Sequence, residues 1–597
     1  MPQYKAPLRE MEFLLHDVFQ VENYYQSLGY DEVNRDLVDA ILTESAKFTE
    51  NELATCRQSG DEVGAKLVDG NVTLPEGFTN AYNTYRDNGW GAMCWDTQWG
   101  GQGLPHSLGI IFHEMCFSAN VAWCAISTLT HGAIRAIEAH GDEEMKNFYL
   151  PKMVAAEWSG TMCLTEPHAG SDVGLVKTKA EPQADGSYQV TGTKIFITQG
   201  ENPYVENIIH LVLARLPDAP KGPKGISLFL VPKFLPNSDG SLGERNAVIC
   251  ASLEKKMGIK ASPTCVLNFD NAKGWLVGKP NKGLAAMFTM MNSARLDVGI
   301  EGLAATELSF QGSLEYAKER LQMRAPTGPK LQDKDADPII YHPDVRRMLM
   351  TQKALAEGCR ALAYQIALHL DAQAHGSEEQ QKQAEDMVAL LTPINKAFLT
   401  DRGLEAANLG IQIFGGHGFI SEHGMEQIVR DVRIALLYEG TNGIQANDLI
   451  GRKLVGSGGK LLRQFIDQIE VLCESCVDVQ ELAEFVGPLA EHAKEWWQLA
   501  EVMMAQAKDD PDYIFAGAVD FQDYSGYVTL AYYWALMAKT ALDKLAAGEG
   551  DAAFYQAKLK TARFYFQRLL PRTRSLVVTM QSGAGNVMDI AEDEFAF

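Results

Sequence analysis

Two segments in the middle of the chain define its organisation: MCLTEPHAGSD at residues 162–172 and KIFITQG at residues 194–200. The first segment joins an apolar run to a Gly-Ser-Asp turn, whose backbone N–H groups can point at an anion or at a carbonyl oxygen. In the second segment Phe196 and Thr198 stand two residues apart, so a strand would present both side chains on one face. Both segments therefore predict β-structure that offers polar and aromatic groups to a ligand.

The sequence around these segments changes its apolar pattern twice. Alternating, β-branched stretches prevail from about residue 160 to residue 276, whereas apolar residues recur at helical spacing before and after them. A Gly-Ser-Gly-Gly stretch at 456–459 then indicates a linker to a last helical segment. We therefore expect an α+β multidomain chain with four parts: an N-terminal helical domain (1–158), a central β-barrel or sandwich (159–277), a C-terminal helical bundle (278–455) and an appended helical domain (456–597).

A third segment, YEGTNGIQ at residues 438–445, places Glu439 in a loop of small residues ahead of a helix. Thr441 or Asn442 could cap that helix, and the helix dipole favours a carboxylate near its first turn. Each of the three segments alone therefore fits a purely structural role. Their occurrence together calls for a functional explanation.

Charge and composition exclude several classes of partner. The chain has 597 residues, and 53 Lys and Arg against 77 Asp and Glu give a formal net charge of −24. This excess of acid argues against a general basic field for nucleic acid or for an anionic membrane, although a local basic pocket stays open. No segment predicts a membrane span, and the sequence has neither a Rossmann fingerprint nor a P-loop.

The ten cysteines form no disulfide framework, which is typical of a reducing compartment. Cys473 and Cys476 form the only CxxC pair, without a second pair or a histidine at ligand spacing, so no metal site is predicted. The N-terminus shows no features of a leader. We therefore expect a cytoplasmic protein.

Together and in this order, the three segments resemble the acyl-CoA dehydrogenase family. The resemblance extends to about Arg452 and includes WGGQG at 99–103 and QIFGGHG at 412–418. The appended C-terminal segment is similar to that of the large bacterial branch of this family. The resemblance implies FAD as cofactor and dehydrogenation of an acyl-CoA thioester to a trans-2-enoyl-CoA. The implied substrate is a fatty acyl-CoA or 3-methylmercaptopropionyl-CoA, and the implied electron acceptor is electron-transfer flavoprotein.

The resemblance also assigns roles to residues. Glu439 matches the base that removes the α-proton while a hydride leaves the β-carbon for flavin N5. Some relatives place the base directly before an arginine that matches Arg295, but here that position is Ala294, which cannot accept a proton. The residues that match cofactor-binding positions are Met162, Leu164, Thr165, Ser171, Phe196, Thr198, Arg320, Gln412, Gly416 and Thr441. Those that match substrate-side positions are Ser171, Arg295 and Gly440.

Arg320, Gln412 and Gly416 match residues that reach the FAD of a neighbouring subunit, so the resemblance implies a homo-oligomer. The appended domain favours a dimer, because in large relatives it occupies the place of a second dimer. The alternative is a flavin-containing DNA-binding protein of the adaptive response, built on the same fold. Binding DNA would require a basic C-terminal domain, whereas the segment after residue 456 carries acidic residues such as Glu470 and Glu474.

Overall fold

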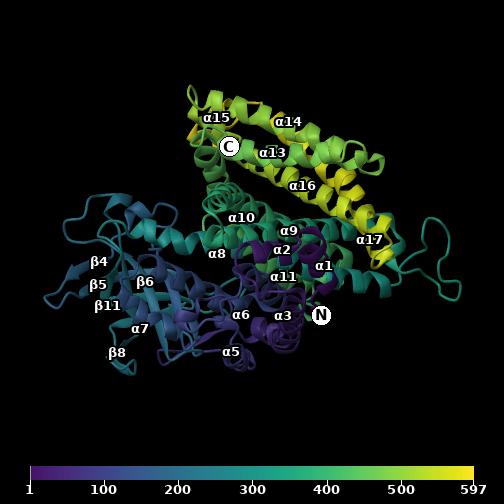
Figure 1. Cartoon of the computed structure of the whole chain (residues 1–597). Helices are drawn as coiled ribbons and strands as arrows, with labels where there is room; N and C mark the ends of the chain where they lie inside the picture. The colour runs from purple at the N-terminus through teal and green to yellow at the C-terminus, as the bar shows by residue number, and fades with distance from the viewer. Residues whose placement is uncertain (1, 597) are drawn as a thin grey trace. The chain divides into compact units, whose positions relative to one another are not determined.

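The computed structural model describes residues 2–596, and the chain divides into two compact units (Figure 1). One unit comprises Met1–Thr43 and Val298–Phe597, and the other comprises Glu44–Asp297. All the named strands lie in the second unit, whereas the first is built from helices.

The second unit begins with helices and one short hairpin. Its helices are α4 (Arg57–Val63), α5 (Phe78–Asp87), α6 (His106–His140) and α7 (Glu143–Val154). The hairpin pairs β1 (Lys66–Val68) with β2 (Asn71–Thr73) inside a region for which the sequence pattern predicted helices alone. Asp69 and Gly70 form its turn with φ values of 49° and 80°, the left-handed pair that a two-residue hairpin needs. The turn preference of the Asp69-Gly70 pair therefore determines the local structure, although the surrounding apolar spacing predicts helix.

Helix α6 carries much of the apolar core of this unit. It changes direction at Asn120, where the backbone leaves the helical region (φ −159°, ψ 88°), and Asn120 Nδ2 donates to the Leu53 carbonyl at 3.2 Å. Among residues 2–596, α6 is the one helix long and apolar enough to cross a membrane by those criteria, and 89% of its most apolar window is buried inside the protein. A helix that is apolar and buried to this extent is typical of the core of a folded domain.

A seven-stranded mixed sheet follows the helices. Its strands are β3 (Trp158–Cys163), β4 (Lys179–Pro182), β5 (Tyr188–Thr198), β6 (Asn207–Ala214), β7 (Ser227–Pro232), β10 (Val248–Leu253) and β11 (Thr264–Val277). The order is β3-β6-β7-β11-β5-β4, with β10 pairing β11. Within this sheet β3 and β6 form the parallel pair, and the other neighbours are antiparallel. A separate hairpin pairs β8 (Phe234–Pro236) with β9 (Leu242–Arg245).

The two central strands, β6 and β7, are buried along their whole length. Leu211 and Leu230 point to one face, where they join a core that includes residues of α6 and α7. Val212 and Phe229 point to the other face and join a second core formed within the β-region. Burial on both faces explains why these strands are continuous apolar runs rather than alternating ones.

The helical unit contains several long helices, and the third sequence segment lies in it at the start of the short helix α12 (Asn442–Asn447). Its principal helices are α1 (Leu8–Glu12), α2 (Val21–Ser27), α8 (Gly283–Glu319, from Val298 onward), α9 (Pro343–His375), α10 (Glu378–Phe414), α11 (Met425–Val432) and α12 (Asn442–Asn447). Helix α3 (Arg35–Phe48) begins in this unit. The appended helices are α13 (Lys460–Ser475), α14 (Ala483–Gln506), α15 (Pro511–Ala516), α16 (Ala518–Ala547), α17 (Ala552–Phe564), α18 (Thr573–Met580) and α19 (Gly585–Met588).

In the appended part, α13, α14 and α16 run beside one another (Figure 1). Helix α16 packs closely on α9 and α10. Trp534 Nε1 donates to the Ala354 carbonyl at 3.1 Å, and a Cβ on Gly526 would stand only 2.1 Å from the Phe398 ring. A larger residue at 526 would therefore force the helices apart. The fold class predicted from the sequence is confirmed, with a mixed sheet as its β-domain.

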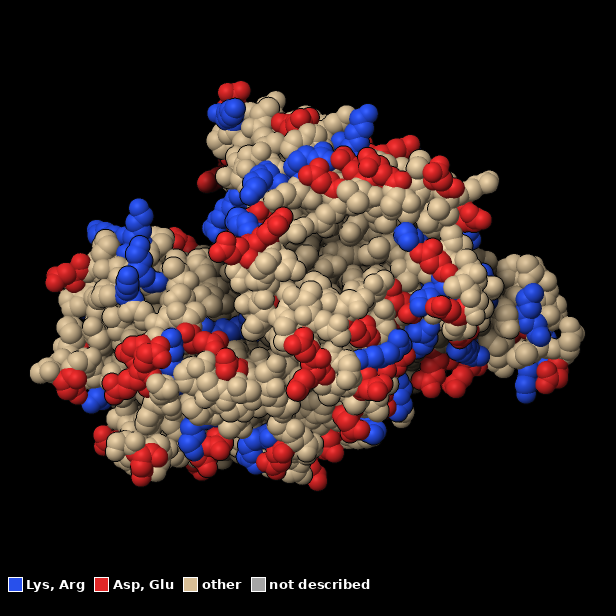
Figure 2. Space-filling model, viewed as in Figure 1, with Lys and Arg blue, Asp and Glu red and all other residues tan. Residues whose placement is uncertain are grey.

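On the face drawn in Figure 2, acidic and basic side chains of the described residues are interspersed. On this face the acidic side chains that contribute to the net charge of −24 lie among basic ones.

Candidate functional site

The structure brings the first two sequence segments together in the Glu44–Asp297 unit. Met162 lies near the end of β3, and Thr165 follows that strand. The N–H of Ile195, in β5, donates to the Thr165 carbonyl at 3.0 Å. The two predicted flavin-lining segments are therefore joined by their backbones.

A buried ion pair fixes this junction. Lys194 is fully buried, and its Nζ donates to Glu166 Oε1 at 2.9 Å and to the Leu164 carbonyl at 3.0 Å. Glu166 also accepts from the N–H and hydroxyl of Thr178 and from the N–H of Lys177. Burial alone would raise the pKa of Glu166, but the Lys194 charge and these hydrogen bonds outweigh it and lower the pKa to about 2.

Phe196 stands at a β-bulge next to this ion pair. Ile197 pairs with Cys265 and Lys194 pairs with Leu267, so two residues of β5 oppose one residue of β11. Phe196 has φ +58° and its side chain is 59% exposed. A left-handed backbone costs a non-glycine residue on the order of 1 kcal/mol or more, so the bulge presents an aromatic ring outward at an energetic cost.

The residues beside Phe196 fit a heterocyclic cofactor such as flavin. Thr198, half-buried, lies two residues further along β5, beyond the buried Ile197. Gln199 has a buried side-chain amide whose nitrogen and oxygen make no hydrogen bond within residues 2–596. Buried amide groups are normally satisfied, so this position suits a ligand that carries both donors and acceptors.

Glu439 lies in the helical unit, in a turn of unusual backbone geometry. Glu439 and Gly440 both have positive φ values, 55° and 88°. The buried Gln445 side chain donates to the Glu439 carbonyl at 3.2 Å, and the Tyr438 hydroxyl donates to the Glu301 carboxylate. Thr441 caps α12 by accepting from the Ile444 N–H at 3.3 Å, so Thr441 rather than Asn442 is the cap.

The other predicted residues of the helical unit lie at helix ends. The rings of Tyr316 and Phe414 stack with centroids 4.0 Å apart, which joins the ends of α8 and α10. Exposed Arg320 directly follows α8, exposed Gln412 lies in the last turn of α10, and exposed Gly416 is the second residue after α10.

Two predicted substrate-side residues lie in the Glu44–Asp297 unit. Arg295, in α8, is buried, with 8% of its surface exposed. Its guanidinium carbon lies 5.9 Å from the centre of the Phe288 ring. Ser171 is exposed and directly precedes Asp172, which lines a basic pocket.

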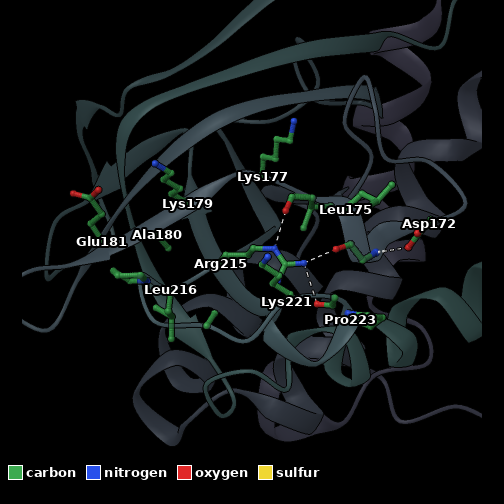
Figure 3. A pocket seen from close by; sticks show the side chains of 15 residues that line it. Asp172, Leu175, Lys177, Lys179, Ala180, Glu181, Arg215, Leu216, Lys221 and Pro223 are labelled. Carbon is green, nitrogen blue, oxygen red and sulfur yellow. Dashed lines mark hydrogen bonds between the residues drawn. The ribbon is translucent and has the colours of Figure 1, made fainter.

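That pocket has a volume of about 890 Å³ and is lined by residues that include Lys177, Lys179 and Lys221 (Figure 3). Arg215 lies at its centre, where its guanidinium donates to four backbone carbonyls and holds the surrounding loops. The three lysines are exposed and free to meet an anion in the pocket. The structure thus contains a local basic pocket, a possibility that the negative net charge did not exclude.

Sequence reasoning missed several residues that shape these sites. Lys194 and Glu166 lie inside the quoted segments, but nothing local showed that they pair. Lys396 was not predicted as a site residue, because it lies within the long helix α10. Its contact with the Gly440 carbonyl, in the Glu439 turn, joins residues that are far apart in the sequence. The pocket lysines carried a weak signal, since they flank the Gly-Ser-Asp turn and a Pro-Lys-Gly loop.

Comparison with known proteins places the chain in the acyl-CoA dehydrogenase family, to which it belongs. The family's N-terminal, middle and C-terminal domain models match residues 39–157, 161–272 and 281–454. A model described as acetyl-CoA dehydrogenase C-terminal like matches residues 465–591. Members of this family are oxidoreductases that bind FAD, which confirms the predicted enzyme class.

Three known proteins illustrate the similarity. The chain is 44% identical to 3-methylmercaptopropionyl-CoA dehydrogenase of Ruegeria pomeroyi, over 95% of this chain and 96% of that one. It is 35% identical to a broad-specificity linear acyl-CoA dehydrogenase of Mycobacterium tuberculosis, over 100% of both chains. The fold is shared with the acyl-CoA dehydrogenase complexed with FAD from Bacillus anthracis, at TM-score 0.73, 22% identity and coverage of 92% and 89%.

The Glu166–Lys194 pair predicts a pH-dependent contribution to stability. Because the pKa of Glu166 is lowered from 4.5 to about 2 in the folded protein, its stabilising effect is complete above about pH 4.5 and is lost as the pH falls toward 2. Glu166→Gln should therefore lower the thermal midpoint most at pH 6 to 7, and the difference from the wild type should narrow below pH 4.5. A constant difference from pH 7 to pH 3 would contradict the assignment. Glu181→Gln, at an exposed position of β4, is the control.

Proposed function

We propose that this protein catalyses the FAD-dependent α,β-dehydrogenation of an acyl-CoA thioester to a trans-2-enoyl-CoA, with Glu439 removing the α-proton. The observation that carries the proposal is the turn in which Glu439 and Gly440 both adopt positive φ, with the Glu439 carbonyl held by a buried glutamine. Backbone strain of this kind persists where a side chain must be held in one position.

The chemistry explains why such a base must be positioned. An α-proton beside a thioester is too weakly acidic for a carboxylate in water. Hydrogen bonds to the thioester oxygen stabilise the developing enolate charge, and removal of water raises the basicity of the carboxylate. We assign the Glu439 N–H as one donor to that oxygen, with Gly440 and Arg295 on the substrate side.

Bound FAD would supply the acceptor for the hydride that leaves the β-carbon. Phe196 would stack on its ring, and Thr165 and Thr198 would offer hydroxyl groups to its edge, with Met162, Leu164 and Ser171 lining the same segment. Arg320, Gln412, Gly416 and Thr441 are assigned to the remainder of the cofactor, Arg320 supplying charge to phosphate.

The basic pocket supports CoA as the carrier of the acyl group. Its three exposed lysines can pair with phosphate groups, and Ser171 of the flavin-lining segment directly precedes the pocket residue Asp172 in sequence. For the acyl group, the names of the two relatives point to 3-methylmercaptopropionyl-CoA and to linear acyl-CoA thioesters. Both remain candidate substrates for this chain.

We also propose electron-transfer flavoprotein as the acceptor, the cytoplasm as the location and a homodimer as the assembly. Large apolar side chains are exposed beside the helix-end residues, with Met323 77% and Phe419 84% exposed near Arg320 and Gly416. A second copy of the chain would cover such side chains. The net charge of −24 and the interspersed charges on the face drawn in Figure 2 favour no nucleic-acid partner.

Replacing the proposed base tests the function. Glu439→Gln keeps the shape of the side chain but removes its basicity, so the purified protein should still bind FAD and acyl-CoA. Its flavin should be reduced by acyl-CoA at least about 100-fold more slowly than in the wild type, as measured by anaerobic stopped-flow absorbance. Glu422→Gln, at an exposed position of the same unit, is the control. Reduction of Glu439→Gln at the wild-type rate would place the base elsewhere.

The pocket lysines should affect substrate binding rather than chemistry. The double variant Lys177→Ala/Lys221→Ala should raise KM for acyl-CoA about 10-fold, since each exposed charge pair is worth up to about 1 kcal/mol and 1.4 kcal/mol is tenfold. The value of kcat should stay unchanged, because the lost contacts are equal in the ground and transition states. Added salt should reduce the difference in KM between the wild type and the double variant, because salt screens the charge pairs of exposed lysines.

Lys224→Ala serves as the control for this double variant, because Lys224 is exposed in the same loop but does not line the pocket. An unchanged KM in Lys177→Ala/Lys221→Ala would remove the pocket from the substrate site.

A further inference from the structure

We propose that Lys396 is a positioning residue for the dehydrogenation, acting through the turn that carries Glu439. The proposal rests on the proposed function, in which Glu439 is the base. Lys396 lies in α10, 43 residues before Glu439, and belongs to none of the segments that define the site in sequence.

The contacts of Lys396 are directed at this turn. Its side chain is fully buried. Its Nζ donates to the Gly440 carbonyl at 2.8 Å and to Asn442 Oδ1 at 2.9 Å. A buried ammonium group is costly unless its hydrogen bonds are made, so these contacts fix the ammonium and its acceptors together.

Asn442 extends the attachment to the body of α10. Its Nδ2 group donates to the Ala397 carbonyl at 3.2 Å and to Thr400 Oγ1 at 3.0 Å. Asp401, one residue further along α10, faces both Lys396 and Asn442. The first residue of α12 is therefore held against one side of α10 by several polar groups.

The contacts of Lys396 and Gln445 fix two consecutive peptide groups. Gln445 Nε2 donates to the Glu439 carbonyl at 3.2 Å, while Lys396 donates to the Gly440 carbonyl. The orientation of these two peptides sets ψ of Glu439 and both backbone torsions of Gly440, and both residues have positive φ. Lys396 thus holds the peptide that follows Gly440 and, together with Gln445, restrains the turn from which the Glu439 carboxylate extends.

A purely structural lysine would affect stability alone, whereas a positioning lysine affects the rate of the chemical step. A misplacement of about 1 Å can cost about 100-fold in rate, while substrate binding far from the reacting atoms is kept. We therefore expect Lys396→Met to lower the first-order rate of flavin reduction at saturating acyl-CoA about 10- to 100-fold, with the half-saturating concentration changed less than about 3-fold.

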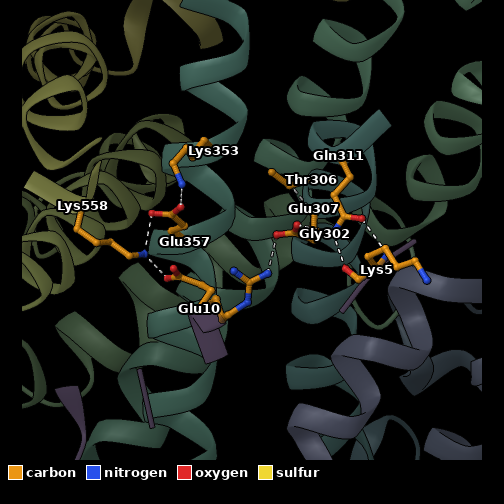
Figure 4. Close-up of polar contacts among 10 residues, drawn as sticks. Lys5, Glu10, Gly302, Thr306, Glu307, Gln311, Lys353, Glu357 and Lys558 are labelled. Atoms are coloured by element: carbon orange, nitrogen blue, oxygen red, sulfur yellow. Dashed lines mark hydrogen bonds and ion pairs between the residues drawn. The ribbon is translucent and has the colours of Figure 1, made fainter. Parts of the chain in front are cut away.

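The control is a second buried lysine of the same unit. Lys558 is 2% exposed and pairs with Glu10 and Glu357, and Glu357 also pairs with Lys353 (Figure 4). Lys558→Met removes a buried ammonium from this separate network. It should lower the thermal midpoint but leave the reduction rate within about 2-fold of the wild type, since none of its partners belongs to the Glu439 turn.

The experiment compares the wild type, Lys396→Met, Lys396→Gln, Lys558→Met and Glu439→Gln as FAD-loaded full-length proteins, with anaerobic stopped-flow reduction by a series of acyl-CoA concentrations. In Lys396→Gln an amide N–H donor replaces the ammonium group, so this variant should retain part of the rate that is lost in Lys396→Met. A Lys396→Met rate within 2-fold of the wild type would overturn the proposal. Should Lys396→Met fail to fold, a Lys396→Gln rate equal to the wild type would overturn it instead.

Glu439→Gln separates this proposal from the function on which it rests. If Glu439→Gln is inactive and Lys396→Met is as fast as the wild type, only the role of Lys396 fails. If Glu439→Gln is reduced at the wild-type rate, the assignment of the base fails, and the role of Lys396 fails with it.

Discussion

The turn that carries Glu439 depends on a backbone conformation that L-amino acids avoid. Two consecutive residues, Glu439 and Gly440, adopt positive φ, and glycine can do so without a steric cost whereas glutamate cannot. Hydrogen bonds from the buried side chains of Lys396 and Gln445 to the two carbonyls of this turn offset that cost. The long helix α10 is therefore more than a packing element, because it supplies the polar groups that hold the turn.

The β-domain solves a similar problem in the same way. Phe196 adopts positive φ at a bulge, and its ring is presented outward. The strand behind it is tied to the preceding segment by the buried Glu166–Lys194 pair. In both places a strained residue of proposed function stands beside a buried lysine, and in both the lysine binds backbone carbonyls as well as a side-chain oxygen. A buried ammonium group that loses its acceptors is costly, so both lysines hold their partners in place.

Much of the fold followed from apolar periodicity, since alternating, β-branched stretches predicted strands from about residue 160 to residue 276 and helical spacing predicted helices on both sides. The central strands β6 and β7 differ from this expectation, because they are buried on both faces and do not alternate. The hairpin at Lys66–Thr73 was missed because its strands are too short for the pattern to appear, although its Asp-Gly turn was visible. Glu439, Phe196 and Thr198 stood out because their segments resemble a family. Lys396 and the Phe196 bulge could not be found from the sequence, because a distant contact and a strand-register mismatch exist only after the chain has folded.

The acidic composition excluded a basic surface but left room for a small basic pocket, and the pocket with Lys177, Lys179 and Lys221 shows how the two agree. A few placed cations are enough for a phosphate-rich ligand, whatever the sign of the net charge.

The most direct test of this account is an anaerobic titration of the purified, FAD-containing protein with a panel of acyl-CoA thioesters, followed by the absorbance of the flavin. The panel includes 3-methylmercaptopropionyl-CoA and straight-chain thioesters of increasing length. The account predicts that at least one of them bleaches the flavin stoichiometrically and yields the trans-2-enoyl-CoA. No bleaching by any acyl-CoA would contradict it.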